Sequence, residues 1–295
     1  IAMPIFHCFC ISVNLMTAMS VGACICIPEN RRTVNLMDAI EHAGCTVVNC
    51  VPTMFLAMLS KENFSPARLK TLRIGVIAGA GYSVEDFLYV QNTIGSHFTL
   101  MSSLGQTECT AGLTVCNIDD PIEIKSTTVG HFMNHVEGKI ADMNTGAPLP
   151  AGETGEICVR GYLTMQRYYG DAAETAKTLD ADGWVHTGDL GAMDADGNIT
   201  LKGRCKELII RGGENISPLE IEQALAANPA VALCKVIGVP DRHFGEEVCA
   251  CIIRAPGAEL DADAVRGWLR PRIAYFKIPR YVVFYDELPK THKGA

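Results

Sequence analysis

Two glycine-containing segments directly follow predicted strands and carry side chains suited to nucleotide chemistry. The segment Ala78–Ser83 reads AGAGYS and comes after the apolar run RIGVIA. Small residues at such a position let a flat ligand or a phosphate approach the backbone closely. Taken by itself, AGAGYS is also explained by a plain tight turn between a strand and a helix.

The second segment is Ser102–Glu108, which reads SSLGQTE. Gly105 permits a sharp turn there. Thr107 offers a hydroxyl to a phosphate oxygen, and Glu108 offers a hard oxygen ligand to Mg²⁺. A capping turn explains this segment equally well when it is considered alone.

Two later segments add a carboxylate and two basic residues. Gly183–Leu190 reads GWVHTGDL, and Asp189 can accept hydrogen bonds from both hydroxyls of a ribose, although an Asx-type turn is the alternative. Arg204 and Lys206 then precede two apolar residues, a Gly pair and a helix start at Ser217–Pro218.

Composition narrows the class of protein. The chain has 295 residues, 48% of them hydrophobic and 20% charged, which is typical of a globular protein with a substantial core. The net charge is −8 and no Lys/Arg cluster stands out, so nucleic acid and anionic membranes are poor candidate partners.

Cysteine usage indicates a reducing compartment. Many of the 13 cysteines lie inside apolar runs, no CxxC pair exists, and we find no Cys/His set with zinc spacing. We therefore predict reduced, buried thiols and a cytoplasmic location.

The first 28 residues contain no Asp, Glu, Lys or Arg. An uncharged apolar run of this length could be a transmembrane helix. Polar residues interrupt the run, however, and it has no basic flank, so a buried strand and helix of an α/β domain explain it better.

The pattern of apolar and turn-forming residues changes twice along the chain. Residues 1–115 alternate short apolar runs with helical periods, which predicts a parallel sheet with flanking helices. Residues 116–203 predict a small β-rich subdomain with tight turns, a distorted barrel. Residues 204–295 predict a small, mobile α+β domain joined by a linker at 204–206.

The predicted strands are Ala23–Ile27, Thr46–Asn49, Arg73–Ala78, Thr99–Ser102, His135–Met143, Glu156–Arg160, Asn198–Leu201, Ala230–Gly238, Glu247–Arg254 and Arg280–Tyr285. The predicted helices are Thr33–Ala43, Pro52–Leu59, Val84–Ile94, Pro218–Ala226 and Ala262–Arg270.

The order of the motifs carries more information than any one of them. The chain contains AGAGYS, SLGQTE, GEICVRG, GWVHTGDLG, GRCKELIIRGGENISPLEIE and LPKTHKG in this order. It thereby resembles the adenylate-forming superfamily of acyl-CoA synthetases, luciferases and peptide-synthetase adenylation domains. The resemblance covers essentially the whole chain. It implies activation of a carboxylate with ATP to acyl-AMP, and then transfer to CoA, with Mg²⁺ as the metal.

The resemblance also implies roles for residues in the first two motifs. Gly79, Ala80 and Gly81 match the loop that lines the adenine and acyl pocket. Thr107 matches the hydroxyl that contacts phosphate, and Glu108 matches the Mg²⁺ ligand. The residues Ser103, Leu104 and Gly105 fall in the same nucleotide-binding segment.

Residues in the later motifs match the ribose site and the mobile domain. Asp189 matches the ribose-binding carboxylate, and Arg204 a basic residue that also reaches the ribose. Lys206 matches the hinge about which the small domain rotates between the two half-reactions. Gly212, Gly213 and Glu214 match the loop used for thioester formation. His7, in the segment PIFH, matches a gate of the carboxylate pocket.

Three departures from the family pattern stand out. Leu104 replaces the usual aromatic residue that stacks on adenine. The phosphate-gripping Ser/Thr/Gly-rich loop that ends in Lys would lie upstream of residue 1. Ala295 stands where the family has its adenylation lysine, which indicates a substitution, a truncation or a shift of register that makes Lys293 the cation.

We therefore expect an AMP-forming acid–CoA ligase, represented here by a C-terminal portion that is inactive alone. Another adenylate-forming ligase and a non-catalytic nucleotide-binding remnant stay as alternatives. The acid is expected to be a fatty or other hydrophobic acid, because the first 21 residues are rich in apolar side chains. The sequence does not specify the acid or the oligomeric state.

Overall fold

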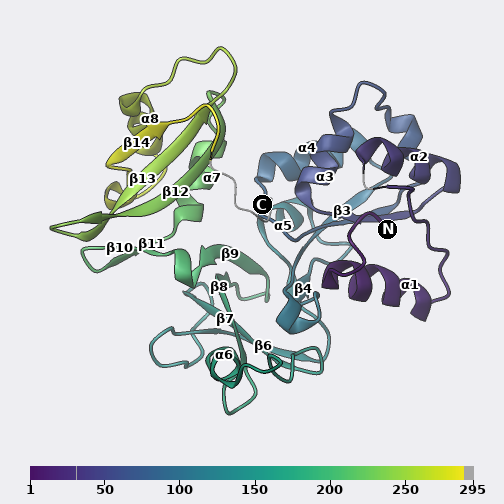
Figure 1. The fold of residues 1–295 in the computed structure, drawn as a ribbon, viewed down its shortest axis with the longest axis horizontal. Coiled ribbons are helices and arrows are strands. Elements are labelled where there is room, and N and C mark those ends of the chain that lie inside the picture. Colours follow the sequence, from purple (N-terminus) through teal and green to yellow (C-terminus); the bar gives the residue numbers. More distant parts are fainter. Residues whose placement is uncertain (31, 289–295) are drawn as a thin grey trace. The chain divides into compact units, whose positions relative to one another are not determined.

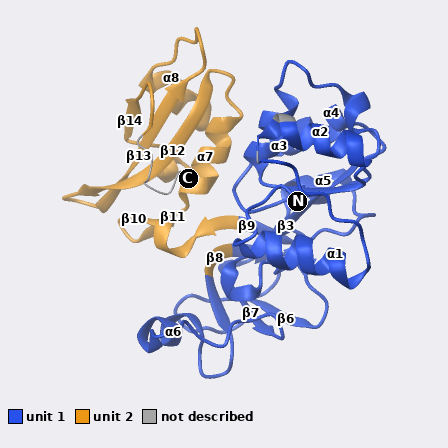
Figure 2. Ribbon diagram, turned by 45° about the vertical axis from the view of Figure 1, so that its right-hand side comes forward, with its two compact units in different colours: residues 1–187, 191–201 blue, residues 188–190, 202–295 orange. Residues whose placement is uncertain are grey.

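The chain divides into two compact units. A computed structural model describes residues 1–30 and 32–288. Unit 1 comprises Ile1–Thr187 and Gly191–Leu201, and unit 2 comprises Gly188–Leu190 and the chain from Lys202 onward (Figure 2). The strands β8 (Val185–Met193) and β9 (Ile199–Arg204) run from one unit into the other. The passage between the units thus falls close to the linker predicted at 204–206, whose role as a hinge stays a prediction.

The first sheet of unit 1 has five strands in the order β1-β2-β3-β4-β5. The first three strands are parallel, and β4 and β5 are antiparallel additions. Helices α2, α3 and α4 lie together on one side of this sheet, and α1 lies on the other side (Figure 1). The strands are Val47–Cys50, Ile74–Ile77, Thr99–Leu104, Thr114–Val115 and His131–Phe132. The helices are α1 Thr17–Ser20, α2 Thr33–Ala43, α3 Pro52–Leu59, α4 Val84–Ile94 and α5 Ile122–Thr127.

Local sequence signals explain where these helices begin and end. Ser83 caps α4 with a capping box, since its Oγ accepts from the Asp86 N–H at 3.0 Å and its own N–H donates to the Asp86 carboxylate at 3.3 Å. Pro52 stands at the first turn of α3, and Gly44 ends α2 with φ +61°. The apolar faces of these helices form one core with the sheet, in which Met37, Phe55 and Phe87 are fully buried. All three helices have the bounds predicted from the sequence.

The predicted strand Ala23–Ile27 is wrong. The N-terminal segment forms a π-helix, Phe9–Met16, that continues into α1, and residues 23–28 carry no regular structure. Gly22 reverses the chain with φ +66°, and the segment then lines a small cavity where it has no strand partner. An apolar run becomes a strand only when its backbone groups find a neighbouring strand. Within the described residues, no helix has the length and apolar character needed to cross a membrane.

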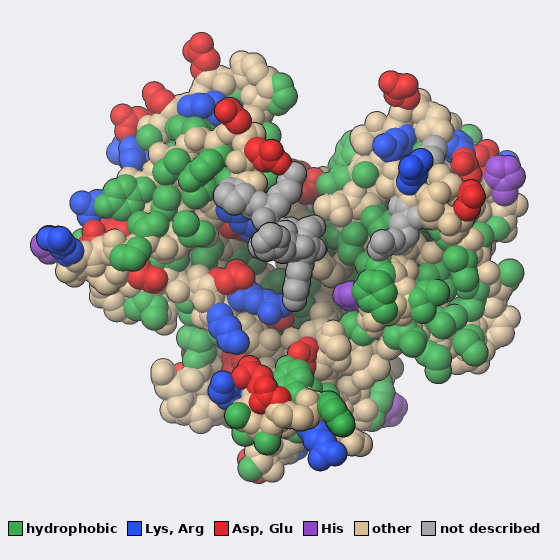
Figure 3. Space-filling model, in the orientation of Figure 1, with side chains coloured by type: hydrophobic (Ala, Val, Ile, Leu, Met, Phe, Trp, Pro, Cys, Tyr) green, Lys and Arg blue, Asp and Glu red, His purple; other side chains and the backbone are tan. Residues whose placement is uncertain are grey.

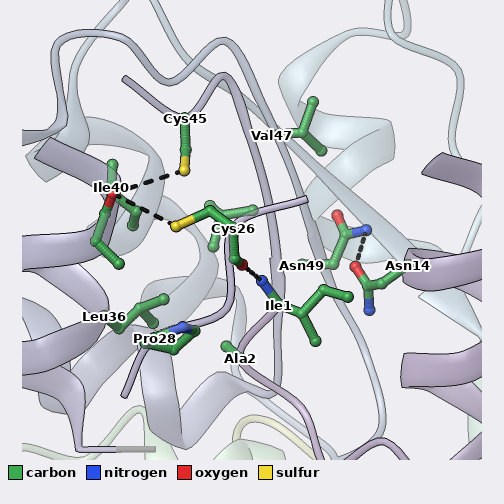
Figure 4. Close-up of a pocket in the computed structure, with 12 residues that line it drawn as sticks. Ile1, Ala2, Asn14, Cys26, Pro28, Leu36, Ile40, Cys45, Val47 and Asn49 are labelled. Carbon is green, nitrogen blue, oxygen red and sulfur yellow. Dashed lines mark hydrogen bonds between the residues drawn. The ribbon is translucent and has the colours of Figure 1, made fainter. Parts of the chain in front are cut away.

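That cavity lies between the N-terminal segment and β1 (Figure 4). Its volume is about 40 Å³, which is room for a few water molecules and not for an acyl chain. Cys26 and Cys45 both point their sulfurs at the carbonyl oxygen of Ala39, at 3.9 and 3.8 Å. None of the 13 cysteines forms a disulfide. Eight of them are buried, whereas Cys24 is exposed, so the prediction that the thiols are buried is wrong for Cys24.

The second sheet has the strand order β6-β7-β8-β9. It corresponds to the predicted β-rich region and is an open sheet, without closure into a barrel across residues 116–203, all of which are described. Asp142 builds the turn between β6 and β7, because its Oδ1 accepts from the backbone N–H groups of Asn144 and Thr145 at 3.0 and 2.8 Å. The strands are Val136–Ala141, Thr154–Gly161, Val185–Met193 and Ile199–Arg204, and α6 is Ala172–Thr178.

Unit 2 contains a third sheet with two helices on one face. The order is β11-β10-β13-β12, and β14 pairs in parallel with β13. Leu225 of α7 and Val265 of α8 are fully buried against this sheet. The strands are β10 Ile209–Arg211, β11 Glu214–Ile216, β12 Val231–Asp241, β13 Gly245–Arg254 and β14 Tyr281–Phe284. The helices are α7 Pro218–Ala226 and α8 Ala262–Leu269, and short 3₁₀ helices elsewhere are Pro66–Leu69, Thr107–Cys109, Cys205–Glu207 and Tyr275–Lys277.

The other face of this sheet carries exposed apolar side chains. Ile237 pairs with Cys249, and Cys249 pairs with Tyr281, so these three residues point to the same side. Ile237 and Tyr281 are both exposed. Hydrophobic side chains gather over this part of unit 2 in the space-filling view (Figure 3).

Candidate active site

The SLGQTE segment turns sharply where β3 ends, and Gly105 makes this turn possible. A Cβ atom at position 105 would lie 1.5 Å from the carbonyl oxygen of Ala111. The chain then enters the 3₁₀ helix Thr107–Cys109 and returns, with the Ala111 N–H donating to the Gln106 carbonyl at 3.0 Å. This tight loop leaves Thr107 exposed and Glu108 half-buried.

A tyrosine far along the chain orients the carboxylate of Glu108. Tyr168 Oη donates to Glu108 Oε1 at 2.6 Å, and the Met165 N–H donates to the Glu108 carbonyl at 2.8 Å. Burial and the adjacent Glu108 carboxylate raise the pKa of Tyr168, so its hydroxyl keeps its proton. The carboxylate is thus held with a defined orientation, next in sequence to the exposed Thr107. Sequence reasoning missed Tyr168, because the segment TMQRYYG has no spacing that points to Glu108.

His7 lies near this loop within unit 1. Its Nδ1 accepts from the Phe9 N–H at 3.1 Å, and it lies 3.9 Å from the sulfur of Cys8. The Cys8 sulfur in turn lies 3.5 Å from Thr107 Oγ1. The structure therefore brings the predicted gate and the predicted phosphate ligand into one neighbourhood.

The AGAGYS loop is tied to β3 by a buried hydrogen bond. Tyr82 Oη donates to Ser102 Oγ at 2.5 Å, and the Ser102 hydroxyl donates to the Lys125 carbonyl. Burial raises the pKa of Tyr82 to about 12. Gly79 has φ +83°, a conformation that favours glycine, and the residues Gly79, Ala80 and Gly81 are exposed.

Ser103 and Leu104 have structural partners in the neighbouring strand. Ser103 Oγ donates to the Thr114 carbonyl at 2.7 Å, and the Leu104 N–H donates to Thr114 Oγ1 at 3.2 Å. These bonds fix the end of β3. The predicted contact of both residues with a nucleotide stays a prediction.

Asp189 and Arg204 meet in unit 2. Arg204 Nε lies 2.8 Å from Asp189 Oδ1. The Asp189 side chain is 6% exposed and that of Arg204 is 56% exposed, so the cation covers a nearly buried carboxylate. The sequence predicted that both residues reach the ribose, and the structure brings the two together. Lys206 is exposed in the 3₁₀ helix Cys205–Glu207 that follows.

The glycine pair forms the tip of the hairpin between β10 and β11. Gly212 and Gly213 have φ +59° and +90°, as a tight hairpin turn requires. Beneath the tip, Arg211 Nε lies 2.8 Å from Glu247 Oε2, and its guanidinium lies 4.3 Å from the ring centre of Phe244. The hydrogen bond from Arg211 lowers the pKa of Glu247 despite the burial of this carboxylate.

The loop is thus an exposed tip on a fixed base. Glu214 is exposed and follows the two glycines. Ala295 and Lys293, the two candidate positions for the adenylation lysine, lie outside the described residues.

Comparison with known families decides what kind of protein carries these loops. The model described as AMP-binding enzyme matches residues 1–169, and the model described as AMP-binding enzyme C-terminal domain matches residues 220–295. The chain belongs to the AMP-binding enzyme family.

Individual members of the AMP-binding enzyme family are similar over the whole chain. A protein of Bacillus subtilis (strain 168) described as an acyl-CoA synthetase, YngI, is 39% identical over 294 residues, which cover 100% of this chain and 53% of that protein. The mitochondrial medium-chain acyl-CoA ligase ACSF2 of Danio rerio is 35% identical over 294 residues, which cover 99% of this chain and 48% of that protein. The chain spans about half the length of these relatives.

A solved structure of the AMP-binding enzyme fold is also similar. The crystal structure of ATP-bound MatB from Rhodopseudomonas palustris matches with a TM-score of 0.90 and 29% identity. The match covers 99% of this chain and 57% of that chain. The α/β fold class predicted from the sequence is therefore confirmed.

The tight turn after β3 generates a first prediction. Gly105→Ala places a methyl group against the Ala111 carbonyl, so we expect a loss of about 1–3 kcal/mol in the free energy of unfolding. Gly112→Ala in the same loop is the control, because a Cβ at position 112 meets no atom within 4 Å. Urea denaturation of both variants measures the difference. Equal stabilities would show that the turn does not depend on glycine at 105.

Proposed function

We propose that the protein containing this chain is an AMP-forming acid–CoA ligase. It would convert a carboxylic acid, ATP and CoA into acyl-CoA, AMP and pyrophosphate. The observation that carries the proposal is the loop after β3, where Tyr168 orients the Glu108 carboxylate and the preceding residue, Thr107, is exposed. Membership of the AMP-binding enzyme family and relatives named as acyl-CoA synthetase or ligase support it.

The chemistry of the first half-reaction fits these side chains. A carboxylate is a poor electrophile, and forming a mixed anhydride with AMP supplies a leaving group. Catalysis of that step depends on alignment and on neutralising charge at phosphorus. Thr107 would donate its hydroxyl to a phosphate oxygen, and the nearly buried Asp189 would bind the ribose beside Arg204.

The residues present fit a Mg²⁺ ion. The metal prefers hard oxygen ligands and is commonly held by one or two carboxylates together with substrate phosphates. Glu108 supplies a carboxylate whose Oε1 is already fixed by Tyr168, and Thr107 stands next to it. When bound, Mg²⁺ would neutralise phosphate charge at this place.

The second half-reaction would use the loops of unit 2. A thiol must reach the acyl carbonyl after pyrophosphate leaves, which a change in the chain at Lys206 would allow. Gly212, Gly213 and Glu214 form an exposed hairpin tip on the Arg211–Glu247 base, suited to contact a long thiol substrate such as CoA. We propose a hydrophobic acid, in keeping with the apolar N-terminal segment. The cytoplasmic location stays a prediction, since one relative is named as mitochondrial.

The proposal is tested on the full-length protein by two assays run side by side. Carboxylate-dependent exchange of pyrophosphate into ATP reports adenylate formation, and CoA-dependent release of AMP reports the ligase reaction. A panel of fatty acids of graded chain length identifies the acid. Exchange without any effect of CoA would favour another adenylating ligase. Nucleotide binding without exchange would favour a non-catalytic protein.

Asp189→Ala should weaken binding of ATP and AMP to the full-length protein. Hydrogen bonds to a charged group contribute about 1.5–3 kcal/mol each, so we expect a loss of affinity of about tenfold or more. Asp196→Ala is the control, because Asp196 is an exposed residue of the next turn. Isothermal calorimetry measures both. Unchanged affinity of the Asp189 variant would assign this residue to the turn alone.

Lys206→Pro should impair thioester formation while adenylate formation is nearly intact. Proline fixes φ near −65° and restricts a segment that must change its backbone dihedrals. Lys206→Ala is the matched control, because it removes the charge and keeps the backbone free. Consumption of pre-made acyl-AMP by CoA is measured beside pyrophosphate exchange. Equal losses in both half-reactions of the proline variant would exclude Lys206 as the pivot.

A further inference from the structure

Three side chains with metal-binding atoms converge on the second sheet. Glu156 and Cys158 lie two residues apart in β7, so they share one face of the sheet, and His186 lies in the neighbouring strand β8. His186 Nδ1 lies 2.8 Å from Glu156 Oε2 and 3.6 Å from Cys158 Sγ. The three ligand atoms all lie within 4.8 Å of one another.

The opposite nitrogen of the same imidazole faces a second carboxylate. His186 Nε2 lies 3.5 Å from Asp180 Oδ2. Asp180 is held in place, since its Oδ1 accepts from the backbone N–H groups of Asp182 and Trp184, both at 2.9 Å. Histidines that bind metals usually direct their other N–H at a carboxylate, which fixes the tautomer and the ring orientation. In this arrangement Nδ1 is the nitrogen left to face an ion.

The separation of the sulfur and the nitrogen suits a tetrahedral zinc ion. With a Zn–S bond of about 2.3 Å and a Zn–N bond of about 2.05 Å, the sulfur and nitrogen of a tetrahedral site lie about 3.5 Å apart. The observed separation of Cys158 Sγ and His186 Nδ1 is 3.6 Å. In the same geometry His186 Nδ1 and a Glu156 oxygen would lie about 3.3 Å apart. The observed distance is 2.8 Å, so the carboxylate would have to move away from the nitrogen by about half an ångström. The Glu156 side chain is 16% exposed.

The alternative to a metal ion beside His186 Nδ1 is a proton on that nitrogen. A doubly protonated imidazole would donate to Glu156 on one side and Asp180 on the other, and Cys158 would then be a small buried hydrophobe. A metal ion differs in one measurable respect, because it recruits the sulfur as a thiolate ligand. Whether the Cys158 sulfur acts as a ligand therefore distinguishes a bound metal ion from a proton on His186 Nδ1.

We propose that Glu156, Cys158 and His186 bind one Zn²⁺ ion, or another divalent ion that accepts sulfur and nitrogen ligands. The thiol proton, and any proton on Nδ1, leave to solvent as the Zn–S and Zn–N bonds form. The side chains of His186 and Glu156 are 30% and 16% exposed, which gives the ion a path and leaves the fourth position to water. The ion would clamp β7 to β8 three residues before Asp189.

Titration of the 295-residue chain with Co²⁺ tests the proposal directly. Cobalt substitutes for zinc, and a thiolate ligand produces a charge-transfer band in the near ultraviolet. We expect this band to saturate at one ion per chain and Zn²⁺ to displace it. Cys158→Ser should abolish the band, and Asp180→Asn should weaken metal affinity by about 10–100-fold. Cys116→Ser is the matched control, because it replaces another buried thiol of unit 1 and should leave the band unchanged.

A second measurement guards against misfolding of the variants. Zn²⁺ should raise the melting temperature of the unaltered chain and of Cys116→Ser, and should not raise that of His186→Gln, which keeps a polar partner for Glu156. A cobalt band that survives Cys158→Ser would overturn the proposal. Equal loss of the band in Cys116→Ser, or no saturable binding at all, would overturn it as well.

Discussion

Parallel pairing of β2 with β3 is the constraint on which the candidate active site depends. Ile77 pairs with Ser102, so both strands end at the same edge of the sheet. AGAGYS leaves β2 there and SLGQTE leaves β3 there, and the bond between Tyr82 and Ser102 joins them. Parallel strands need helical crossovers, which α4 supplies with its buried face. The glycines of both loops are useful only because this pairing brings them to one place.

Buried polar contacts hold the remaining parts of the site. Tyr168 reaches Glu108 across 60 positions of sequence, and Arg204 covers the nearly buried Asp189. Such groups are costly to bury without a partner, so each contact fixes one segment of the chain against another. The Arg211–Glu247 pair has the same effect beneath the glycine hairpin of unit 2. The segments proposed to bind charged substrates are thereby given a defined conformation.

Much of this architecture could be predicted from the sequence, because its signals are local. Proline at the start of α3 and α7 and apolar residues at helical spacing in α2 predicted helix bounds that match the structure. The strand expected at Ala23–Ile27 failed because hydrophobicity shows that a segment is apolar and does not show that a partner strand exists. The order of the motifs identified the family, although the roles of single residues stay predictions.

Contacts between residues that are distant in the sequence could not be predicted from it. Tyr168 gave no signal in the sequence, and Cys158 lies 28 residues from His186 without any of the familiar zinc spacings. The alternation Glu-x-Cys does place two ligands on one face of a strand. It becomes meaningful only when the neighbouring strand is known, because strand order decides which residue stands opposite.

The parallel pairing of β13 with β14 has a consequence for how unit 2 is made. β13 ends at Arg254, and its partner β14 begins only at Tyr281, after α8 has crossed the sheet. The ribosome synthesises the chain from the N-terminus, so β13 emerges before β14 has been made. Until Tyr281–Phe284 arrive, one edge of a strongly apolar strand stays open to other chains. The speed of synthesis across α8 thus sets how long unit 2 is exposed to aggregation.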